Sequence, residues 1–209
     1  KILDLLRQPM EEGSITVSHL NQTVVFPAKT MIAAAMNPCK CGFFPDLGKC
    51  RCAPPQTRRY LNRVSGPFLD RIDIGVEVPR QDLGMMAAEK SIDEGSFPQT
   101  EQRNSSAVMR ARVMEARARQ EKRFADEFIS YNSQMTRRQI EEYCRLSGED
   151  AVFLEKVERQ QGISARGHGK ILKVARTLAD LDGQAEIGRT QLAEAIGFRS
   201  FEKKYWGSL

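Results

Sequence analysis

Apolar and polar side chains alternate along residues 15–19, and residues 23–26 are rich in β-branched and aromatic side chains. Alternation with a period of two is typical of a β-strand, because successive side chains point to opposite faces of a sheet. Asn21 and Gln22 lie between the two runs and suit a turn. The pattern therefore predicts a β-hairpin over residues 11–26.

Two further segments of the first 80 residues are strand-like. Residues 31–36 form a continuous apolar run, which suits a strand buried on both faces of a parallel sheet, although a short buried helix would show the same pattern. Residues 72–78 have strand character before a proline. Helical patterns cover residues 56–64 and 68–71. This mixture predicts an α/β fold for the first 80 residues.

The second half of the chain follows a helical period. The clearest amphipathic pattern covers residues 164–181, where apolar side chains recur at helical spacing. Shorter helical patterns are expected over residues 107–124, 136–146, 150–160 and 190–196.

The polar stretch between the two halves is predicted to be a flexible connector, because it carries few apolar residues and several Gly, Ser and Pro residues. We therefore expect an α/β part over residues 1–80, a connector over residues 81–106 and an all-α part over residues 107–209.

Composition adds little to this picture. The chain is 41% hydrophobic and 28% charged, which is ordinary for a globular protein. No apolar run reaches the roughly 18–20 residues needed to span a bilayer, so we expect a cytoplasmic protein without a membrane partner. The net charge of +5 favours an anionic partner, either a nucleotide or a nucleic acid, without requiring one.

The cysteines give the strongest chemical signal. Four of the five lie close together in two pairs, Cys39 with Cys41 and Cys50 with Cys52. Four thiolates can surround one Zn²⁺ tetrahedrally, and the loop between the pairs is long enough to bring them together. The alternative is a loop of four reduced cysteines. Cys144 stands apart and reads as an ordinary core thiol.

The chain has no phosphate-binding loop of the Walker A type. The nearest match runs from Ser164 to Ile171, but Ser164 replaces the first glycine and Ile171 replaces the Mg²⁺-binding Ser or Thr. We therefore expect no tight binding of MgATP by this chain alone.

Three single polar residues have two readings each. Asn37 follows the apolar run and could orient a water or a phosphate, or it could simply end a strand. Arg71 could act on a phosphate or form a surface ion pair. Arg166 opens the best amphipathic helix, where an arginine opposes the helix dipole unless an anion compensates. Basic residues also lie along the helix expected over residues 107–124. A solvent-exposed helix face explains these residues more economically than contact with a nucleic acid.

Two long motifs connect these features. The first is FPAKTMIAAAMNPCKCGFFPDLGKCRCAPPQTRRYLNRVSGPFLDRIDIGVEVP, which begins at Phe26; the second is ISARGHGKILKVARTLADLDG, which begins at Ile163 and is followed by LAEAIGFR. In order and spacing they resemble magnesium-chelatase-like AAA+ ATPases of the ComM/YifB type. The resemblance covers essentially the whole chain and implies the part of such an ATPase that follows the Walker A and Walker B segments.

The resemblance implies specific roles. In this family Asn37 would be sensor 1, Arg71 the arginine finger that reaches the ATP of a neighbouring subunit, and Arg166 sensor 2. The parent protein would hydrolyse ATP with Mg²⁺ as a ring, expected to be a hexamer, and would act on DNA as a branch-migration motor. Residues 1–80 would belong to the AAA+ core and residues 107–209 to its helical lid, and this chain would be inactive alone.

Two other functions remain open at this point. The chain could belong to the ATPase motor subunit of a true magnesium chelatase, which would need neither zinc nor DNA; the four-cysteine loop argues against it, because those subunits have a shorter connection there. It could also be a zinc-stabilised interaction module without any link to ATP.

Overall fold

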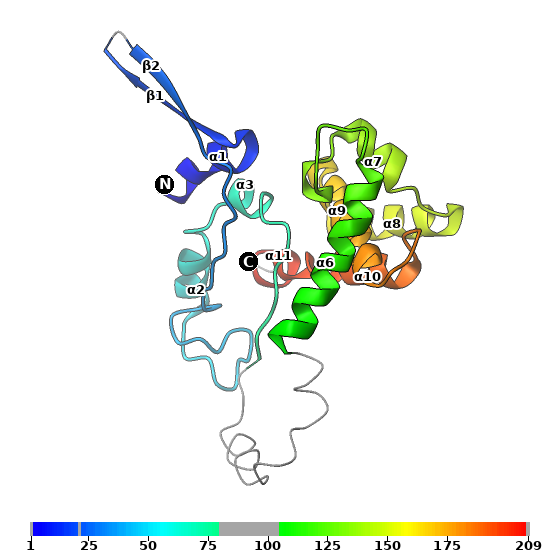
Figure 1. The fold of residues 1–209 in the computed structure, drawn as a ribbon. Helices are drawn as coiled ribbons and strands as arrows, with labels where there is room; N and C mark the ends of the chain where they lie inside the picture. Colours follow the sequence, from blue (N-terminus) through cyan, green and yellow to red (C-terminus); the bar gives the residue numbers. More distant parts are fainter. Residues whose placement is uncertain (1, 21, 80–104, 208–209) are drawn as a thin grey trace, which may run out of the picture. The chain divides into compact units, whose positions relative to one another are not determined.

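The chain divides into two units in the computed structural model, which describes residues 2–20, 22–79 and 105–207 (Figure 1). The first unit comprises Lys1–Gly75 together with Arg199–Leu209, and the second comprises Val76–Phe198. The expected connector over residues 81–106 lies almost entirely outside the described residues. The expected boundaries at residues 80 and 106 therefore stay a prediction.

The first unit begins with a short helical segment and a hairpin. The helices η1 (Leu3–Leu6) and α1 (Arg7–Glu12) lead into the antiparallel strands β1 (Ser14–His19) and β2 (Gln22–Pro27) (Figure 1). Gly13 ends α1 in the left-handed region at φ 61°, which a residue without a Cβ adopts at little cost. The predicted hairpin is confirmed.

One face of the hairpin is apolar and open. Ile15 lies opposite Phe26 and Val17 lies opposite Val24, so these four side chains share a face of the two-stranded sheet. All four are exposed, at 41%, 52%, 49% and 45% respectively. The hairpin therefore extends away from the helices of its unit instead of joining their core.

The remaining helices of the first unit are short and have clear start signals. Helix α2 (Pro54–Leu61) begins with two prolines, whose fixed φ suits the first helical turn. Helix α3 (Gly66–Leu69) is capped by Ser65, whose Oγ accepts a hydrogen bond from the Phe68 amide. Leu61, Phe68 and Leu69 are buried and form the apolar interior of this unit.

The two strands expected at residues 31–36 and 72–78 do not form in the structure. Both segments lack regular secondary structure, and most of residues 31–36 are exposed, including Met31 at 93%. A strand exists only when a neighbour takes its backbone hydrogen bonds, and within the described residues β1 and β2 pair with each other alone. The apolar run of residues 31–36 therefore does not form the expected buried element, and no parallel sheet forms among the described residues.

The end of the chain packs within the first unit, although the sequence pattern predicts it to be part of the all-α region of residues 107–209. Helix α11 (Ser200–Tyr205) is followed by Trp206, whose indole Nε1 donates a hydrogen bond to the Leu61 carbonyl over 3.1 Å. The Tyr205 ring lies 6.2 Å from that of Phe44. A Cβ on Gly75 would lie 2.2 Å from the Phe201 ring, so glycine is required for this close approach.

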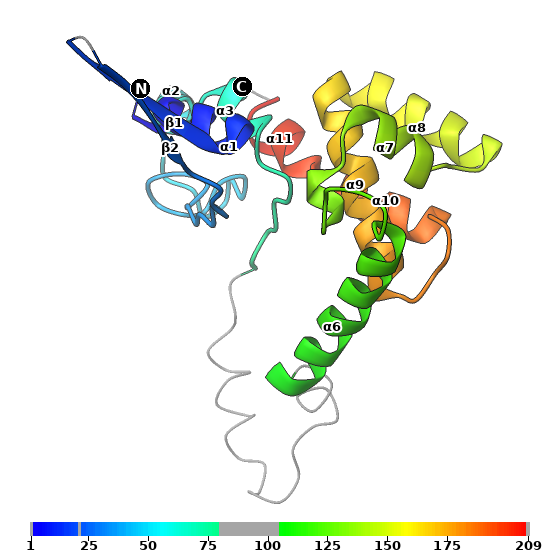
Figure 2. The same ribbon diagram turned by 45° about the horizontal axis from the view of Figure 1, so that its top comes forward.

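The second unit is a bundle of helices around the central helix α9 (Ala165–Leu181). Helix α9 contacts the segment η2 (Asn132–Gln134) as well as its neighbouring helices (Figures 1 and 2). The neighbours are α6 (Ser106–Arg123), α7 (Arg137–Tyr143), α8 (Gly148–Gln161) and α10 (Arg189–Gly197).

All five helices expected in the second half form, with ends that shift by a few residues at most. Side-chain caps explain the starts: Ser147, Ser164 and Thr136 each accept a hydrogen bond from a backbone amide three residues later. The buried side of α9 includes Ile171, Leu172 and Ala175, as its amphipathic pattern predicted.

The bundle has one continuous apolar core, which Leu154, Ile171, Leu192 and their neighbours fill. Cys144 is part of it at 3% exposure, and burial raises the pKa of its thiol to about 11. A neutral buried thiol behaves as a small apolar side chain. The expected assignment of Cys144 as a core residue is confirmed.

A buried charge cluster lies beside this core. Asp180 on α9 has no exposed surface. Its carboxylate accepts hydrogen bonds from Nη1 and Nη2 of Arg123 over 2.8 and 2.5 Å. Asn132 donates to it over 2.8 Å and Arg176 over 3.1 Å. Since these donors come from α6, η2 and α9, the single carboxylate joins three elements of the bundle.

We expect Asp180→Asn to lower the free energy of unfolding of the 209-residue chain by about 3–5 kcal/mol, because the buried Arg176 and the partly buried Arg123 would lose their countercharge. Chemical denaturation followed by circular dichroism measures this loss. Glu141→Gln, which removes an exposed pair with Arg137, is the control and should change stability by less than about 0.5 kcal/mol. Equal losses of stability in the two variants would contradict the role of Asp180 as the countercharge of Arg123 and Arg176.

The same carboxylate makes stability depend on pH. Burial alone would raise the pKa of Asp180, but the hydrogen bonds from Arg123 and Asn132 outweigh it and hold that pKa below its ordinary value. A lowered pKa contributes stability above the unfolded value of about 3.9, and the contribution is lost as the pH falls through the folded value. Acid denaturation below about pH 4 should therefore be less steep in Asp180→Asn.

None of the described helices combines the length and the apolar character required to cross a lipid bilayer.

Candidate metal centre and sensing residues

The four clustered cysteines lie on a loop between the segment of residues 28–38 and α2. Gly42 adopts φ 79°, a left-handed conformation that turns the chain directly after the first pair. Asp46 then shapes the far end of the loop, because its Oδ1 accepts hydrogen bonds from the amides of Gly48 and Lys49 over 3.0 and 3.3 Å. These two turns bring the second pair back to the first.

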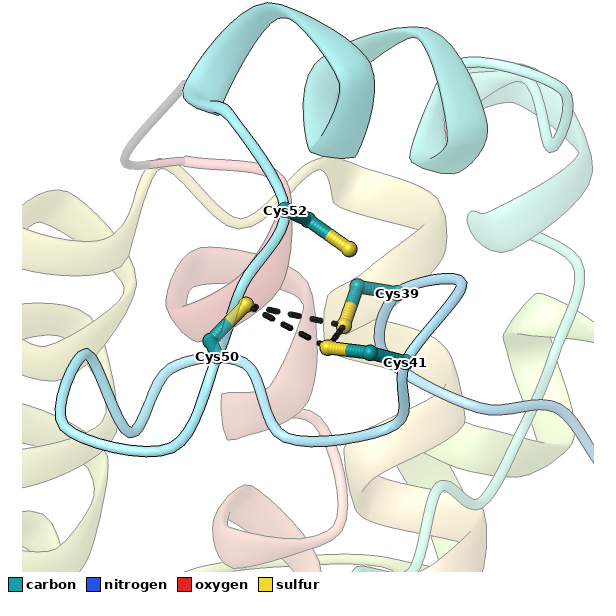
Figure 3. Close-up of side chains that lie close together, drawn as sticks. All are labelled: Cys39, Cys41, Cys50 and Cys52. Carbon is teal, nitrogen blue, oxygen red and sulfur yellow. Dashed lines mark hydrogen bonds between the residues drawn. The ribbon is translucent and has the colours of Figure 1, made fainter.

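The four sulfur atoms converge on one point (Figure 3). The Sγ of Cys39 lies 3.3 Å from that of Cys41 and 3.8 Å from that of Cys50, and the Cys41 and Cys50 sulfurs are 3.6 Å apart. With Cys52, all four sulfurs lie within 4.8 Å of one another. All four are free thiols, so no disulfide occupies the cluster.

This geometry passes a simple test for a tetrahedral metal. A Zn–S bond of about 2.3 Å in a tetrahedron requires sulfur atoms about 3.8 Å apart. The sulfurs of Cys39, Cys41 and Cys50 are 3.3, 3.8 and 3.6 Å apart, and that of Cys52 lies within 4.8 Å of them. The cysteines supply all four ligand positions, so the site leaves none open for a substrate. The expected convergence of the four cysteines is confirmed, and the cluster could hold a metal ion.

The protein surroundings already favour thiolate at one position. A hydrogen bond from the Phe43 amide, and then one from the Cys39 thiol, lower the pKa of Cys41 to about 6. The Cys52 amide favours the thiolate of Cys50, but burial and the neighbouring Cys41 and Cys39 sulfurs outweigh it and raise the pKa of Cys50 to about 11. Four sulfurs this close cannot all be anionic without a cation among them.

Arg71 lies just after α3 and is largely buried, at 8% exposure. Its guanidinium donates to the carboxylate of Glu11 on α1 over 2.6 Å and to the carbonyl of Pro67. Glu11 is itself 36% exposed, so the ion pair lies at the edge of the unit. The sequence singled out Arg71 but gave no sign of Glu11, which is 60 residues away along the chain.

The two expected sensor residues are exposed and lie in different units. Asn37 belongs to the first unit and follows the segment 31–36. Arg166 is in the first turn of α9 in the second unit, two residues after the capping Ser164. The positive end of the helix dipole at this turn favours an anion nearby. Asn37 and Arg71 share a unit; the role of each residue stays a prediction.

Sequence reasoning missed a further arginine. Arg199 is 5% exposed and donates to the Ile72 carbonyl over 2.8 Å. Its position at the end of the LAEAIGFR motif was the only available signal, since the contact spans 127 residues of sequence.

Comparison with known proteins places this geometry in a family. Residues 1–86 match the family model described as magnesium chelatase, subunit ChlI, and residues 103–199 match the model of the ChlI C-terminal region. The competence protein ComM of Haemophilus influenzae is 41% identical over 201 residues, which cover 96% of this chain and 36% of ComM.

Other relatives agree. The uncharacterized protein YifB of Escherichia coli is 39% identical over 97% of this chain, and YifB of Salmonella typhimurium is 37% identical over the same share. The chain spans 36–37% of the length of these relatives. With such identity over nearly its whole length, the chain belongs to the magnesium-chelatase-like family that includes ComM and YifB.

Proposed function

We propose that this chain is the sensing and coupling part of a ring-forming AAA+ ATPase that acts on DNA. The observation that carries the proposal is the 41% identity to a competence protein over 96% of the chain. In this proposal the first unit belongs to the ATPase core and the helical unit is its lid. ATP and Mg²⁺ would be held by the intact protein, since this chain has no Walker A motif.

In this proposal three residues contact the nucleotide, each in a different role. Asn37 orients water or the γ-phosphate as sensor 1, and Arg166 reports the nucleotide to the lid as sensor 2. Arg71 is the arginine finger, which neutralises charge that develops on the phosphoryl group in a neighbouring subunit. A finger that acts in trans requires an adjacent copy, so this role implies a ring, which we expect to be a hexamer.

The ion pair with Glu11 fits a finger that alternates between two anions. In the chain by itself the Arg71 guanidinium, at 8% exposure, is satisfied by the Glu11 carboxylate. Nη2 of Arg71 contacts Glu11, whereas two oxygens of a phosphate could accept both ends of the guanidinium fork and carry more charge. Exchange of one anion for the other keeps the guanidinium paired throughout, so Arg71 never lies buried without a countercharge.

The four-cysteine cluster holds a structural Zn²⁺ in this proposal. Four thiolates without an open ligand position are typical of structural zinc sites. Four reduced cysteines in one loop also fit a cytoplasmic protein. The metal would fix the loop that carries Phe44 and thereby the surface against which Tyr205 packs, where the two rings are 6.2 Å apart.

The hairpin is the candidate element for DNA. It extends from the first unit with an exposed apolar face and with Ser, Thr and His side chains. In a ring, six such hairpins would present the same residues to one strand.

The test uses the full-length protein. We expect it to hydrolyse ATP, and we expect single-stranded or branched DNA to raise kcat several-fold, because DNA would engage a moving element of the ring. The measurement is phosphate release with and without DNA at one fixed salt concentration, since nucleic-acid binding depends steeply on salt. ATP turnover that DNA leaves unchanged would contradict the DNA-acting part of the proposal.

A magnesium chelatase motor subunit is the second candidate, and the descriptions of both matching family models favour it. It predicts ATP turnover that responds to a partner subunit and not to DNA. A zinc-stabilised interaction module is the third, and the cysteine cluster favours it. That module predicts no ATP turnover at all in the full-length protein.

A further inference from the structure

Arg199 lies at the junction between α10 and α11 and is held inside the first unit. Its Nη1 donates to the Ile72 carbonyl over 2.8 Å. Its Nη2 pairs with Glu202 on α11 and lies 3.8 Å from the Asp70 carboxylate. With 5% of its surface exposed, the guanidinium is a fixed structural element and not a solvated surface charge.

The contacts of Arg199 lie on both sides of Arg71. Asp70 precedes the proposed finger and Ile72 follows it, and Arg199 contacts the side chain of one and the backbone of the other. This stretch is a turn after α3, in which the Arg71 and Ile72 amides donate to the carbonyls of Phe68 and Leu69 over 3.0 and 2.9 Å. The turn sets the direction in which the Arg71 side chain leaves the backbone.

We propose that Arg199 is a positioning residue for Arg71. It braces the turn of residues 70–72 so that the guanidinium of Arg71 is presented in one orientation. Arg199 comes two residues after Gly197, where α10 of the helical unit ends. The inference rests on the proposed role of Arg71 as the finger.

The contacts of Arg199 with the turn of residues 70–72 are separate from the contacts that attach the end of the chain. Trp206 holds the same segment through its hydrogen bond of 3.1 Å to the Leu61 carbonyl, and Tyr205 packs near Phe44. Loss of Arg199 leaves these contacts in place and releases the turn. Loss of the Trp206 hydrogen bond weakens the attachment and leaves the brace.

The experiment measures ATP turnover of the full-length protein in Arg199→Ala, Arg71→Ala and the double variant. We expect Arg199→Ala to lower kcat by about 10²-fold, as a displacement of about 1 Å can do, with the KM for ATP unchanged. The double variant should be no slower than Arg71→Ala alone, because both changes remove the same interaction. Arg199→Lys, which keeps the charge but not the fork of donors, should be intermediate.

Trp206→Phe is the matched control for a purely structural role. It should lower the melting temperature while kcat stays at the wild-type value. If Arg199→Ala and Trp206→Phe reduce kcat in proportion to their loss of stability, Arg199 is structural and the inference is wrong. If Arg199→Ala does not fold, Arg199→Lys carries the test, and wild-type kcat in that variant overturns the inference.

The two levels of the proposal fail differently. Wild-type kcat in Arg199→Ala beside an inactive Arg71→Ala would contradict the positioning role of Arg199 and would leave the finger role of Arg71 intact. Wild-type kcat in Arg71→Ala contradicts the finger itself.

Discussion

Replacement of Cys39, Cys41, Cys50 and Cys52 by serine should abolish metal binding and unfold the loop between residues 39 and 53. The purified 209-residue chain is expected to carry about one zinc ion, and the quadruple variant none. The loop has almost no apolar core of its own. Of the four cysteines, Cys39 is buried and the other three are partly exposed. Bound zinc would therefore contribute on the order of 10 kcal/mol to this local fold.

Elemental analysis of the two proteins measures the metal, and limited proteolysis measures the loop. The loop contains Lys40, Lys49 and Arg51, so trypsin should cut the variant there far faster than the parent chain. The helical unit should keep its circular dichroism, because its core contains none of the four ligands.

Cys144→Ser is the matched control, since it removes the remaining cysteine of the chain. It should leave the metal content unchanged and cost stability through its buried position in the helical core. A parent chain that contains no metal and still resists trypsin in the loop would refute the zinc site. It would also bring the chelatase subunit back level with the DNA motor, because the two candidates differ in this loop.

The helical unit could be predicted from sequence because its signals are local. Thr136 and Ser164 mark helix starts through side chains that bond amides three residues away, and the amphipathic period of α9 marks its buried side. The cysteine cluster was predictable for a related reason. Its two pairs are close in sequence, and only a loop of a few residues had to close between them.

The errors have one physical origin, which is that long-range partners leave no local trace. Residues 31–36 carry the apolar pattern of a buried strand, but a strand depends on a neighbour, and no described segment pairs with them. The return of the chain end depends on Trp206 and Leu61, which are 145 residues apart. Arg199 and Glu11 were missed for the same reason, since each is defined by a distant contact.

Arg71→Ala in the full-length protein should lower kcat for ATP hydrolysis by about 10³–10⁵-fold, the range found for arginine fingers in other NTPases. ATP binding should persist, because the finger acts on charge that develops in the transition state and not on the ground state. The measurements are phosphate release and equilibrium binding of a fluorescent ATP analogue. Arg63→Ala, which removes an exposed arginine of the same unit, is the control and should keep wild-type turnover.

The ion pair with Glu11 has to be separated from the finger. Arg71→Ala removes the partner of Glu11 as well as the finger, and either loss could lower turnover. Glu11→Gln removes the carboxylate and leaves the guanidinium in place, so we expect it to keep turnover within a few-fold of the wild type. Low kcat in Glu11→Gln would show that the pair itself is required and would contradict the exchange of anions at Arg71.

A finger that acts in trans makes one more prediction. Rings assembled from mixtures of wild-type and Arg71→Ala subunits should lose turnover more steeply than the fraction of wild-type subunits, because each variant subunit silences the ATP site of its neighbour and interrupts any coupling around the ring. Turnover that falls in direct proportion to that fraction is expected if each subunit works alone. That result, together with a monomeric protein in solution, would remove the reason for a ring and leave Arg71 as the partner of Glu11 within a single chain.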